Sequence, residues 1–285
     1  MKKSPIDARL PEGMDPLKDG RCCDLCGGRS FRRLHAWPVG DRWNPAAIPF
    51  AVWLCECGLV FLHPVPTAGQ LPDRGDWWSA NRKEFRRRRW FKKRWGKVRQ
   101  MLIGTAKDRL LAATRKVMPS GRLLDVGCGD GKMMRLAGAS YQCVGLEPSA
   151  AAAAIVRERG FSVIENTLED APIEPSSFDV VLMDSIIEHV HSPMLVLAKV
   201  NRILRVGGVV VLLTPKFGGP AYRMHKAGWN GFRHGYHTFL FTGETLGRYL
   251  EQNGFEVLRR PRRDRMLDDI LILWGRKTRE LAPSR

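Results

Sequence analysis

A glycine-rich loop between a predicted strand and a predicted helix constrains the fold of this chain more than any other feature. The loop, residues 127–131 (GCGDG), lies between the apolar run Arg122–Val126 and a helical segment that starts at Lys132. Glycines let the backbone approach a ligand closely, and the N-terminus of the following helix favours negative charge. A dinucleotide-binding fingerprint would have a further glycine at position 132, where this chain has a lysine. The segment therefore predicts a ligand-binding loop of a different α/β family.

The C-terminal part of the chain alternates short apolar runs with helical patterns. Further strands are predicted at 142–147, 162–165, 178–183, 208–214, 255–259 and 269–274, and further helices at 150–159, 193–204 and 242–253. Such alternation predicts right-handed βαβ units around a mostly parallel sheet with helices on both faces. We therefore expect residues 119–285 to form one α/β domain.

The loop and three later segments resemble the motifs of class I S-adenosylmethionine (SAM)-dependent methyltransferases. The spacing G-x-G-x-G with Asp125 before it resembles motif I, residues 178–190 (FDVVLMDSIIEHV) resemble the fourth-strand motif, and residues 202–208 (RILRVGG) resemble the turn before the fifth strand. Glu147 is the last residue of the second predicted strand, where an acid of this family binds the ribose hydroxyls. The resemblance covers residues 121–280 and implies a Rossmann-like fold, SAM as cofactor and methyl transfer. The cofactor-binding residues that it implies are Asp125, Gly127, Gly129, Gly131, Glu147, Thr167, Leu168 and Asp184.

Two histidines are candidates for a general base, which methyl transfer needs only when the acceptor is a hydroxyl or an acidic carbon. His189 follows the strand 178–183, at the end where open α/β sheets bind ligands, although it could equally be a structural turn residue. His237 lies in a segment that resembles the family's H-x-x-x-F-[ST] motif, after a long loop that we expect to cover the substrate. We favour His237 over His189.

The Glu188-His189 pair also resembles part of the E-x-x-E-H pattern of ubiquinone-pathway O-methyltransferases, which is associated with a divalent metal. In this chain Ser185 replaces the first glutamate of that pattern. We therefore do not infer a catalytic metal from this pattern.

Four cysteines near the N-terminus have the spacing of a structural metal site. Cys23 and Cys26 form a C-x₂-C pair, and Cys55 and Cys57 form a shorter C-x-C pair. Four thiolates favour zinc, although Cys22 could replace Cys23, and the cysteines could instead belong to a small core. The unit resembles a zinc-ribbon-like segment that precedes some bacterial methyltransferases of polysaccharide and deoxysugar biosynthesis. We expect a zinc module over 21–66, after a flexible tail over 1–20.

The formal net charge of +18 depends mainly on one segment, Arg82–Arg99, in which aromatic residues alternate with cations. The segment belongs to a predicted linker and basic amphipathic helix over 67–118. Three interpretations remain open: a solvated helix face, an interfacial helix on an anionic membrane surface, and a nucleic-acid contact. A strong basic segment favours a polyanionic partner.

The sequence contains neither an apolar run of membrane-spanning length nor a signal-peptide pattern, so we expect a cytoplasmic protein, or one peripheral on the inner face of the membrane. The predicted function is SAM-dependent O-methylation of a sugar or glycan intermediate, either a small molecule or lipid-linked. The alternatives are an RNA methyltransferase and a non-catalytic, zinc-bearing nucleic-acid-binding protein. The catalytic region has no N/D-P-P-Y-type motif for methylation of base amino groups, and residues 214–217 (TPKF), after the fifth strand, resemble instead the carbohydrate-associated group of methyltransferases.

Overall fold

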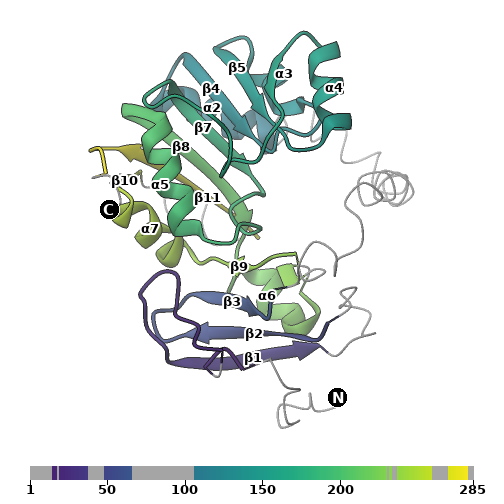
Figure 1. Cartoon of the computed structure of the whole chain (residues 1–285), viewed down its shortest axis with the longest axis vertical. Helices are drawn as coiled ribbons and strands as arrows, with labels where there is room; N and C mark the ends of the chain where they lie inside the picture. Colours follow the sequence, from purple (N-terminus) through teal and green to yellow (C-terminus); the bar gives the residue numbers. More distant parts are fainter. Residues whose placement is uncertain are drawn as a thin grey trace.

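The computed structural model describes residues 15–17, 19–37, 48–65, 106–229, 231–232, 236–258 and 269–281. These residues form two β-sheets, a large one with helices on both faces and a small one below it (Figure 1). Most of the predicted tail, the linker and most of the predicted basic helix, including Arg82–Arg99, lie outside the described residues. Among the residues that are described, no helix has both the length and the apolar character needed to cross a membrane.

The large sheet has seven strands within the described ranges, in the order β10-β11-β8-β7-β4-β5-β6. The strands are β4 (Gly121–Val126), β5 (Tyr141–Leu146), β6 (Ser162–Ile164), β7 (Phe178–Asp184), β8 (Leu204–Pro215), β10 (Phe255–Leu258) and β11 (Ile270–Lys277). Strand β11 runs antiparallel to both of its neighbours, and the pairs from β8 to β6 are all parallel. The prediction of a mostly parallel, Rossmann-like sheet is thus confirmed.

Helices cover both faces of this sheet. They are α2 (Ala106–Val117), α3 (Lys132–Ala137), α4 (Ala150–Glu158), α5 (Pro193–Ile203) and α7 (Gly243–Gln252). Apolar residues of α2, α3 and α4 share one core cluster with alternate residues of the strands, and those of α5 and α7 share another. Three of the helix starts have a side-chain cap, supplied by Ser149, Ser192 and Thr242, and such caps satisfy backbone N–H groups that a helix leaves unpaired.

The small sheet combines N-terminal and C-terminal residues. Strands β1 (Phe31–Trp37), β2 (Phe50–Cys55) and β3 (Val60–His63) form an antiparallel meander. Strand β9 (Phe239–Leu240) pairs with the open edge of β3. The sheet therefore takes strands from both sides of the domain boundary that the sequence predicts near residue 119.

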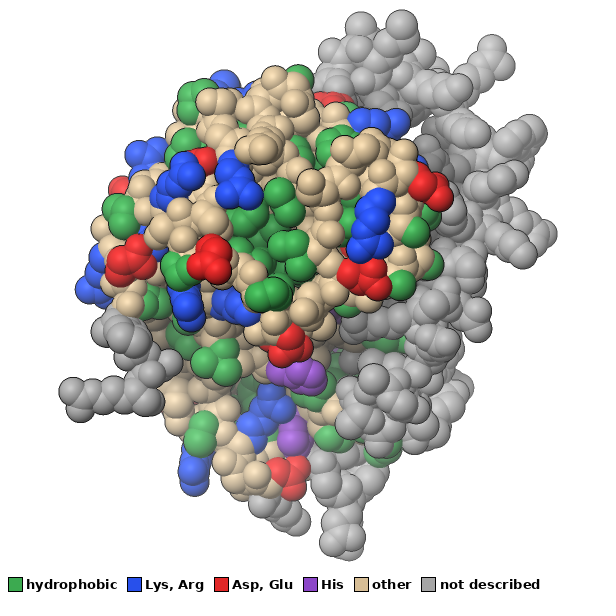
Figure 2. All heavy atoms as spheres, turned by 45° about the horizontal axis from the view of Figure 1, so that its top comes forward, with side chains coloured by type: hydrophobic (Ala, Val, Ile, Leu, Met, Phe, Trp, Pro, Cys, Tyr) green, Lys and Arg blue, Asp and Glu red, His purple; other side chains and the backbone are tan. Residues whose placement is uncertain are grey.

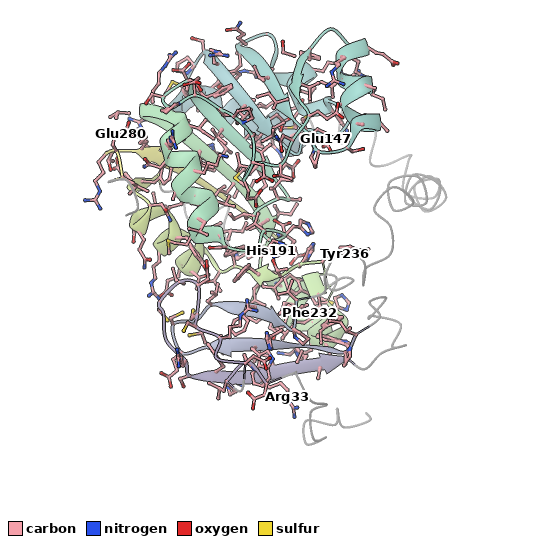
Figure 3. All side chains as sticks on the ribbon, in the orientation of Figure 1. Arg33, Glu147, His191, Phe232, Tyr236 and Glu280 are labelled. Carbon is pink, nitrogen blue, oxygen red and sulfur yellow. The ribbon has the colours of Figure 1, made fainter. Side chains whose placement is uncertain are left out.

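Each face of the small sheet is covered by a different part of the chain. Ala51, Trp53 and Phe61 pack in the same core cluster as α7. Val52 and Leu62, on the alternate face, pack against the segment after β8, which contains α6 (Pro220–His225), a short 3₁₀ turn (Lys226–Gly228) and the buried aromatic residues Trp229 and Phe232. Phe232 lies close to β3 in Figure 3. The small sheet is thus enclosed between two parts of the C-terminal region.

Candidate functional site

The predicted cofactor loop connects β4 to α3 and has the conformation that glycine permits best. Gly127, Gly129 and Gly131 have positive φ angles of 66°, 55° and 72°. A side chain at Gly127 would also collide with Ile186, because its Cβ would lie 2.3 Å from the Ile186 Cδ1. The loop therefore needs glycine both for its backbone angles and for its close approach to the chain after β7.

The carboxylate of Glu147 holds the loop in place. It accepts hydrogen bonds from the backbone N–H of Gly129 at 2.9 Å and of Ser149 at 3.0 Å. Glu147 lies at the end of β5, beside the loop (Figure 3). A carboxylate oxygen accepts more than one hydrogen bond, so this group can also receive the hydroxyl groups of a ribose, as the resemblance implies.

Asp125, the other predicted acid, is almost completely buried in β4. Its Oδ2 atom has no hydrogen-bond partner among the described residues. Burial raises the pKa of Asp125 to about 7; the nearby negative charges of Asp184 and Glu147 also raise it, and the ammonium of Lys107 lowers it. The Oδ2 atom of Asp125 could accept a hydrogen bond from the ammonium group at the amino acid end of SAM, and the acceptors around the loop therefore suit the implied cofactor.

The three remaining predicted cofactor residues lie at the carboxyl ends of β7 and β6. Asp184 ends β7 and forms an ion pair with Lys107 of α2, with 2.8 Å between Oδ2 and Nζ. Thr167 and Leu168 follow β6: the Thr167 hydroxyl donates to Asp170 at 2.9 Å, and Leu168 is buried. All three lie at or just past the carboxyl ends of parallel strands, the side on which open α/β sheets bind ligands.

The two candidate bases, His189 and His237, are distant in the sequence but lie together in the structure. Their ring centroids are 4.7 Å apart. The Nδ1 of His189 donates to the carbonyl of Tyr236 at 2.8 Å, and that of His237 donates to the carbonyl of Gly231 at 2.7 Å. A carbonyl only accepts, so Nδ1 carries the proton and Nε2 carries the lone pair in each neutral ring. Both rings thus have the tautomer of a base or a metal ligand.

Thr238 fixes the backbone next to both histidines. Its hydroxyl reaches the carbonyls of Glu188 at 3.0 Å and Val190 at 2.8 Å, and its own carbonyl accepts from the Leu62 N–H at 2.9 Å. The histidine pair therefore lies where the loop after β7 of the large sheet meets β9 of the small sheet. Figure 3 shows Tyr236 and His191, neighbours of the pair in sequence, at this junction.

A cavity of about 400 Å³ lies at the end of β8. It is lined by Pro215, Ala221, His225, Gly228, Trp229, Gly231, Asp269 and Ile270. Gly231 connects it to the histidine pair, since its carbonyl accepts the hydrogen bond from His237. The described part of the segment that was expected to cover the substrate, residues 215–236, thus forms one wall of this cavity.

The four predicted zinc ligands, Cys23, Cys26, Cys55 and Cys57, form a compact group. The Cys23 and Cys57 sulfurs are 3.6 Å apart, and the Cys26 and Cys55 sulfurs are 3.7 Å apart. Zinc–sulfur bonds of about 2.3 Å in a tetrahedron would place the sulfurs about 3.8 Å apart, so the geometry fits zinc. Cys22 lies outside the group.

Asp24, between the first two cysteines, joins this cysteine group to the large domain. Its carboxylate accepts from the Tyr249 hydroxyl at 2.9 Å and from the Ser192 hydroxyl at 2.6 Å. Arg248 also donates to the carbonyl of Cys57 at 3.0 Å. The group is therefore fixed to the start of α5 and to α7.

Sequence reasoning named Glu188 only as part of a pattern with His189, and it missed both the burial of Glu188 and strand β9. Glu188 is fully buried directly beside the histidine pair, and β9 connects the pair to the small sheet. The apolar run 50–55 could have indicated β2. Strand β9, in contrast, has only two residues and leaves no pattern in the sequence.

The chain is similar to methyltransferases. A family model described as a methyltransferase domain matches residues 83–260. A ubiquinone biosynthesis O-methyltransferase of Xanthomonas campestris is 31% identical over 110 residues, which cover 36% of this chain and 46% of that protein. An uncharacterised protein of Methanocaldococcus jannaschii is 28% identical over 102 residues, 36% of this chain and 48% of that protein. The chain spans about half the length of the curated relatives it matches.

The solved structures agree on the fold. A SAM-dependent methyltransferase of Thermotoga maritima, described as a possible histamine N-methyltransferase, aligns with a TM-score of 0.50 at 24% identity. The alignment covers 64% of this chain and 94% of that one.

Proposed function

This chain belongs to the methyltransferase-domain family, and from that membership we propose that it transfers the methyl group of SAM to a hydroxyl oxygen of a small molecule. When bound, SAM supplies a methyl group on a sulfonium centre, which is a good leaving group. The protein therefore contributes mainly by positioning the acceptor and removing its proton. The observation that carries the proposal is the histidine pair, in which His189 follows β7, the strand that ends at Asp184.

The loop and its acids would hold the cofactor. Glu147 would accept the ribose hydroxyls while it keeps the loop closed through Gly129. The buried carboxyl of Asp125 would face the amino acid end, and Lys107 and Asp184 lie near it as a charged pair. Thr167 and Leu168 remain proposals for the adenine contact.

Proton removal from a hydroxyl acceptor is the role that we propose for the histidines. In each neutral ring Nε2 has the lone pair, and the Nδ1 hydrogen bonds to Tyr236 and Gly231 hold the rings in place. We favour His237 as the base because Gly231 links it directly to the cavity, and we assign His189 to orienting the acceptor.

A sugar or glycan intermediate is the acceptor class that we propose. The cavity lining combines the Trp229 ring with the polar groups of His225 and Asp269, and a ring with hydroxyl groups could use both kinds of contact. The resemblance of the cysteine-containing N-terminal unit to segments found in polysaccharide-associated enzymes also favours this class. Several relatives are named ubiquinone biosynthesis O-methyltransferases, and these names support a hydroxyl acceptor. Phenols are therefore the acceptor class to compare with sugars in the assay.

RNA is the second candidate acceptor. On the face shown in Figure 2, Lys and Arg side chains alternate with Asp and Glu among the described residues, without the continuous basic band typical of nucleic-acid contacts. The segment Arg82–Arg99 is the feature that would favour RNA, and it lies outside the described residues.

The experiment is methyl transfer from labelled SAM to four acceptor classes: nucleotide-linked sugars, lipid-linked glycans, dihydroxylated phenols and total RNA. Labelling of a sugar or glycan supports the proposal. Labelling of the phenols alone would support O-methylation but refute a sugar or glycan as the acceptor. Labelling of RNA alone would refute both the small-molecule acceptor and the sugar class. His237→Ala should lower kcat by at least about 100-fold, as expected for loss of a general base, with unchanged affinity for S-adenosylhomocysteine. The exposed His191→Ala is the matched control.

A structural zinc ion and a peripheral membrane position complete the proposal. The four-cysteine group would hold the zinc, and Arg82–Arg99 would contact anionic lipid. Co-sedimentation with anionic but not neutral vesicles, lost on replacement of residues 86–89 by glutamine, tests the second point. Absence of vesicle binding would leave the segment as a solvated face.

A further inference from the structure

The four-cysteine group takes no part in the proposed chemistry, yet each of its two turns is attached to a segment that carries one of the histidines. The C-x₂-C turn contains Asp24, which reaches the start of α5 shortly after His189. The C-x-C turn connects β2 to β3, and β3 pairs with β9 shortly after His237. The group therefore has a separate connection to each histidine.

Asp24 forms the connection to His189. Its Oδ1 accepts a hydrogen bond from the Ser192 hydroxyl at 2.6 Å, and its Oδ2 accepts from the Met194 N–H at 3.2 Å and from the Tyr249 hydroxyl at 2.9 Å. Ser192 is the N-cap of α5 and Met194 lies in its first turn, where N–H groups lack partners within the helix and an acidic side chain is favoured. Asp24 thus fixes the end of the loop that carries His189.

Strand β3 forms the connection to His237. It begins soon after Cys57, at the end of the C-x-C turn, and runs antiparallel to β9. The Leu62 N–H of β3 donates to the carbonyl of Thr238, the residue after His237, at 2.9 Å. The position of the C-x-C turn therefore sets the position of the segment that carries His237.

The cysteines connect the two turns to each other. A metal ion with four thiolate ligands holds them in a tetrahedron of fixed size, so the separation of the turns is set at this group. That separation limits how far His189, attached through Asp24, and His237, attached through β3, can move apart. Each close pair of sulfurs takes one cysteine from either turn: Cys23 with Cys57, and Cys26 with Cys55.

We propose that the four-cysteine group holds the two histidines in their relative position and that Asp24 is a positioning residue for them. Thr238 ties the two histidine segments together on one side, and Asp24 holds the far end of the His189 loop. A displacement of about 1 Å can lower the rate of a reaction about 100-fold, so loss of this support should slow proton removal. The effect on catalysis rests on the proposed function of the histidines as bases.

The test compares two acids that each lie between metal-binding cysteines. Asp24→Ala removes three hydrogen bonds to the large domain. Glu56→Ala, at an exposed residue of the C-x-C turn, removes the hydrogen bond from Ser30, which belongs to the same N-terminal part of the chain. Imidazole ¹⁵N NMR of the full-length, zinc-loaded proteins follows both histidines without an assay of activity. Their signals should shift or broaden in Asp24→Ala and match the wild type in Glu56→Ala.

Kinetic measurements on the same variants separate positioning from general stability. In Asp24→Ala we expect kcat to fall at least about tenfold with KM unchanged. Zinc content and the affinity for S-adenosylhomocysteine should equal those of the wild type. If Asp24→Ala does not fold, Tyr249→Phe replaces it, because it removes one of the three hydrogen bonds to Asp24 and should give smaller shifts of the same signals.

Unchanged histidine signals in the folded variant would refute the proposal, whatever the methyl-transfer assay shows. A loss of cofactor affinity as large as the fall in kcat would also refute it, since it would indicate a general structural role for Asp24. Changed histidine signals in a protein that methylates none of the acceptors would support the positioning role and count against the proposed function instead.

Discussion

Replacement of Asp125 by asparagine should change how the stability of the protein depends on pH. Asp125 is buried in β4, and the loss of hydration raises its pKa to about 7, with Asp184 and Glu147 adding to the effect and Lys107 opposing it. In the unfolded chain the group has its ordinary value of 3.8. Between these values the folded state holds a proton that the unfolded state has released. Stability therefore falls as the pH rises through this window.

The size of the effect follows from the two pKa values. A tenfold change in proton affinity corresponds to about 1.36 kcal/mol. Across the whole interval between the two pKa values of Asp125, the free energy of unfolding can therefore change by at most about 4 kcal/mol. From about pH 5.5 to about pH 8, linkage predicts that the wild type loses about 2 kcal/mol of unfolding free energy relative to Asp125→Asn. The asparagine cannot ionise, so its own cost of burial is the same at both pH values.

Urea unfolding of both proteins at the two pH values measures this difference. The pH effects of all other groups occur in both proteins and cancel. Asp130→Asn, which removes a half-exposed carboxylate from the same loop, is the matched control. If the difference in unfolding free energy between wild type and Asp125→Asn were constant across the range, the reasoning from burial would be wrong.

Three further predictions concern the cofactor loop and the cysteines. Gly127→Ala should lower the free energy of unfolding and the affinity for S-adenosylhomocysteine more than Gly160→Ala does, as measured by urea unfolding and calorimetry. Both glycines have a positive φ, but nothing lies within 4 Å of a Cβ at Gly160, whereas a Cβ at Gly127 would collide with Ile186. Equal losses in the two variants would contradict the role of the contact with Ile186. Glu147→Ala should weaken cofactor binding by about 1–3 kcal/mol, the value of charge-assisted hydrogen bonds, and an unchanged dissociation constant would argue against the assignment. Elemental analysis should find one zinc per chain, lost with a fall in stability in Cys26→Ser, whereas zinc-free wild type would exclude the metal.

The large sheet could be predicted because its signals are local. Strands β4, β5, β7 and β8 each contain an apolar run, and the glycine loop identifies the strand that precedes it. The helices α4, α5 and α7 begin at Ser149, Ser192 and Thr242, residue types that favour helix starts. Since these patterns depend on neighbours in the sequence, the predicted elements match the observed ones apart from their ends.

The arrangement at the histidine pair depends on contacts between distant segments. Nothing near His189 in the sequence indicates that its ring centroid lies 4.7 Å from that of His237. The segment that contains His237 leads into β9, and β9 pairs with β3, which lies far away in the sequence. The burial of Glu188 likewise results from packing of the loop after β7 beneath Thr238. Tertiary pairing of this kind leaves no periodic pattern, so the site could be predicted only as separate residues.

The pairing of β3 with β9 also affects the order in which the chain can fold during synthesis. The first three strands of the small sheet and all four cysteines precede residue 66, but the strand that completes the sheet is at 239–240. Until then the edge of β3 has unpaired backbone groups, and an open edge is a site where other chains can add a strand. The nascent protein would therefore be most prone to aggregate while the large domain is being made. That vulnerability ends only when Phe239 and Leu240 have joined the sheet.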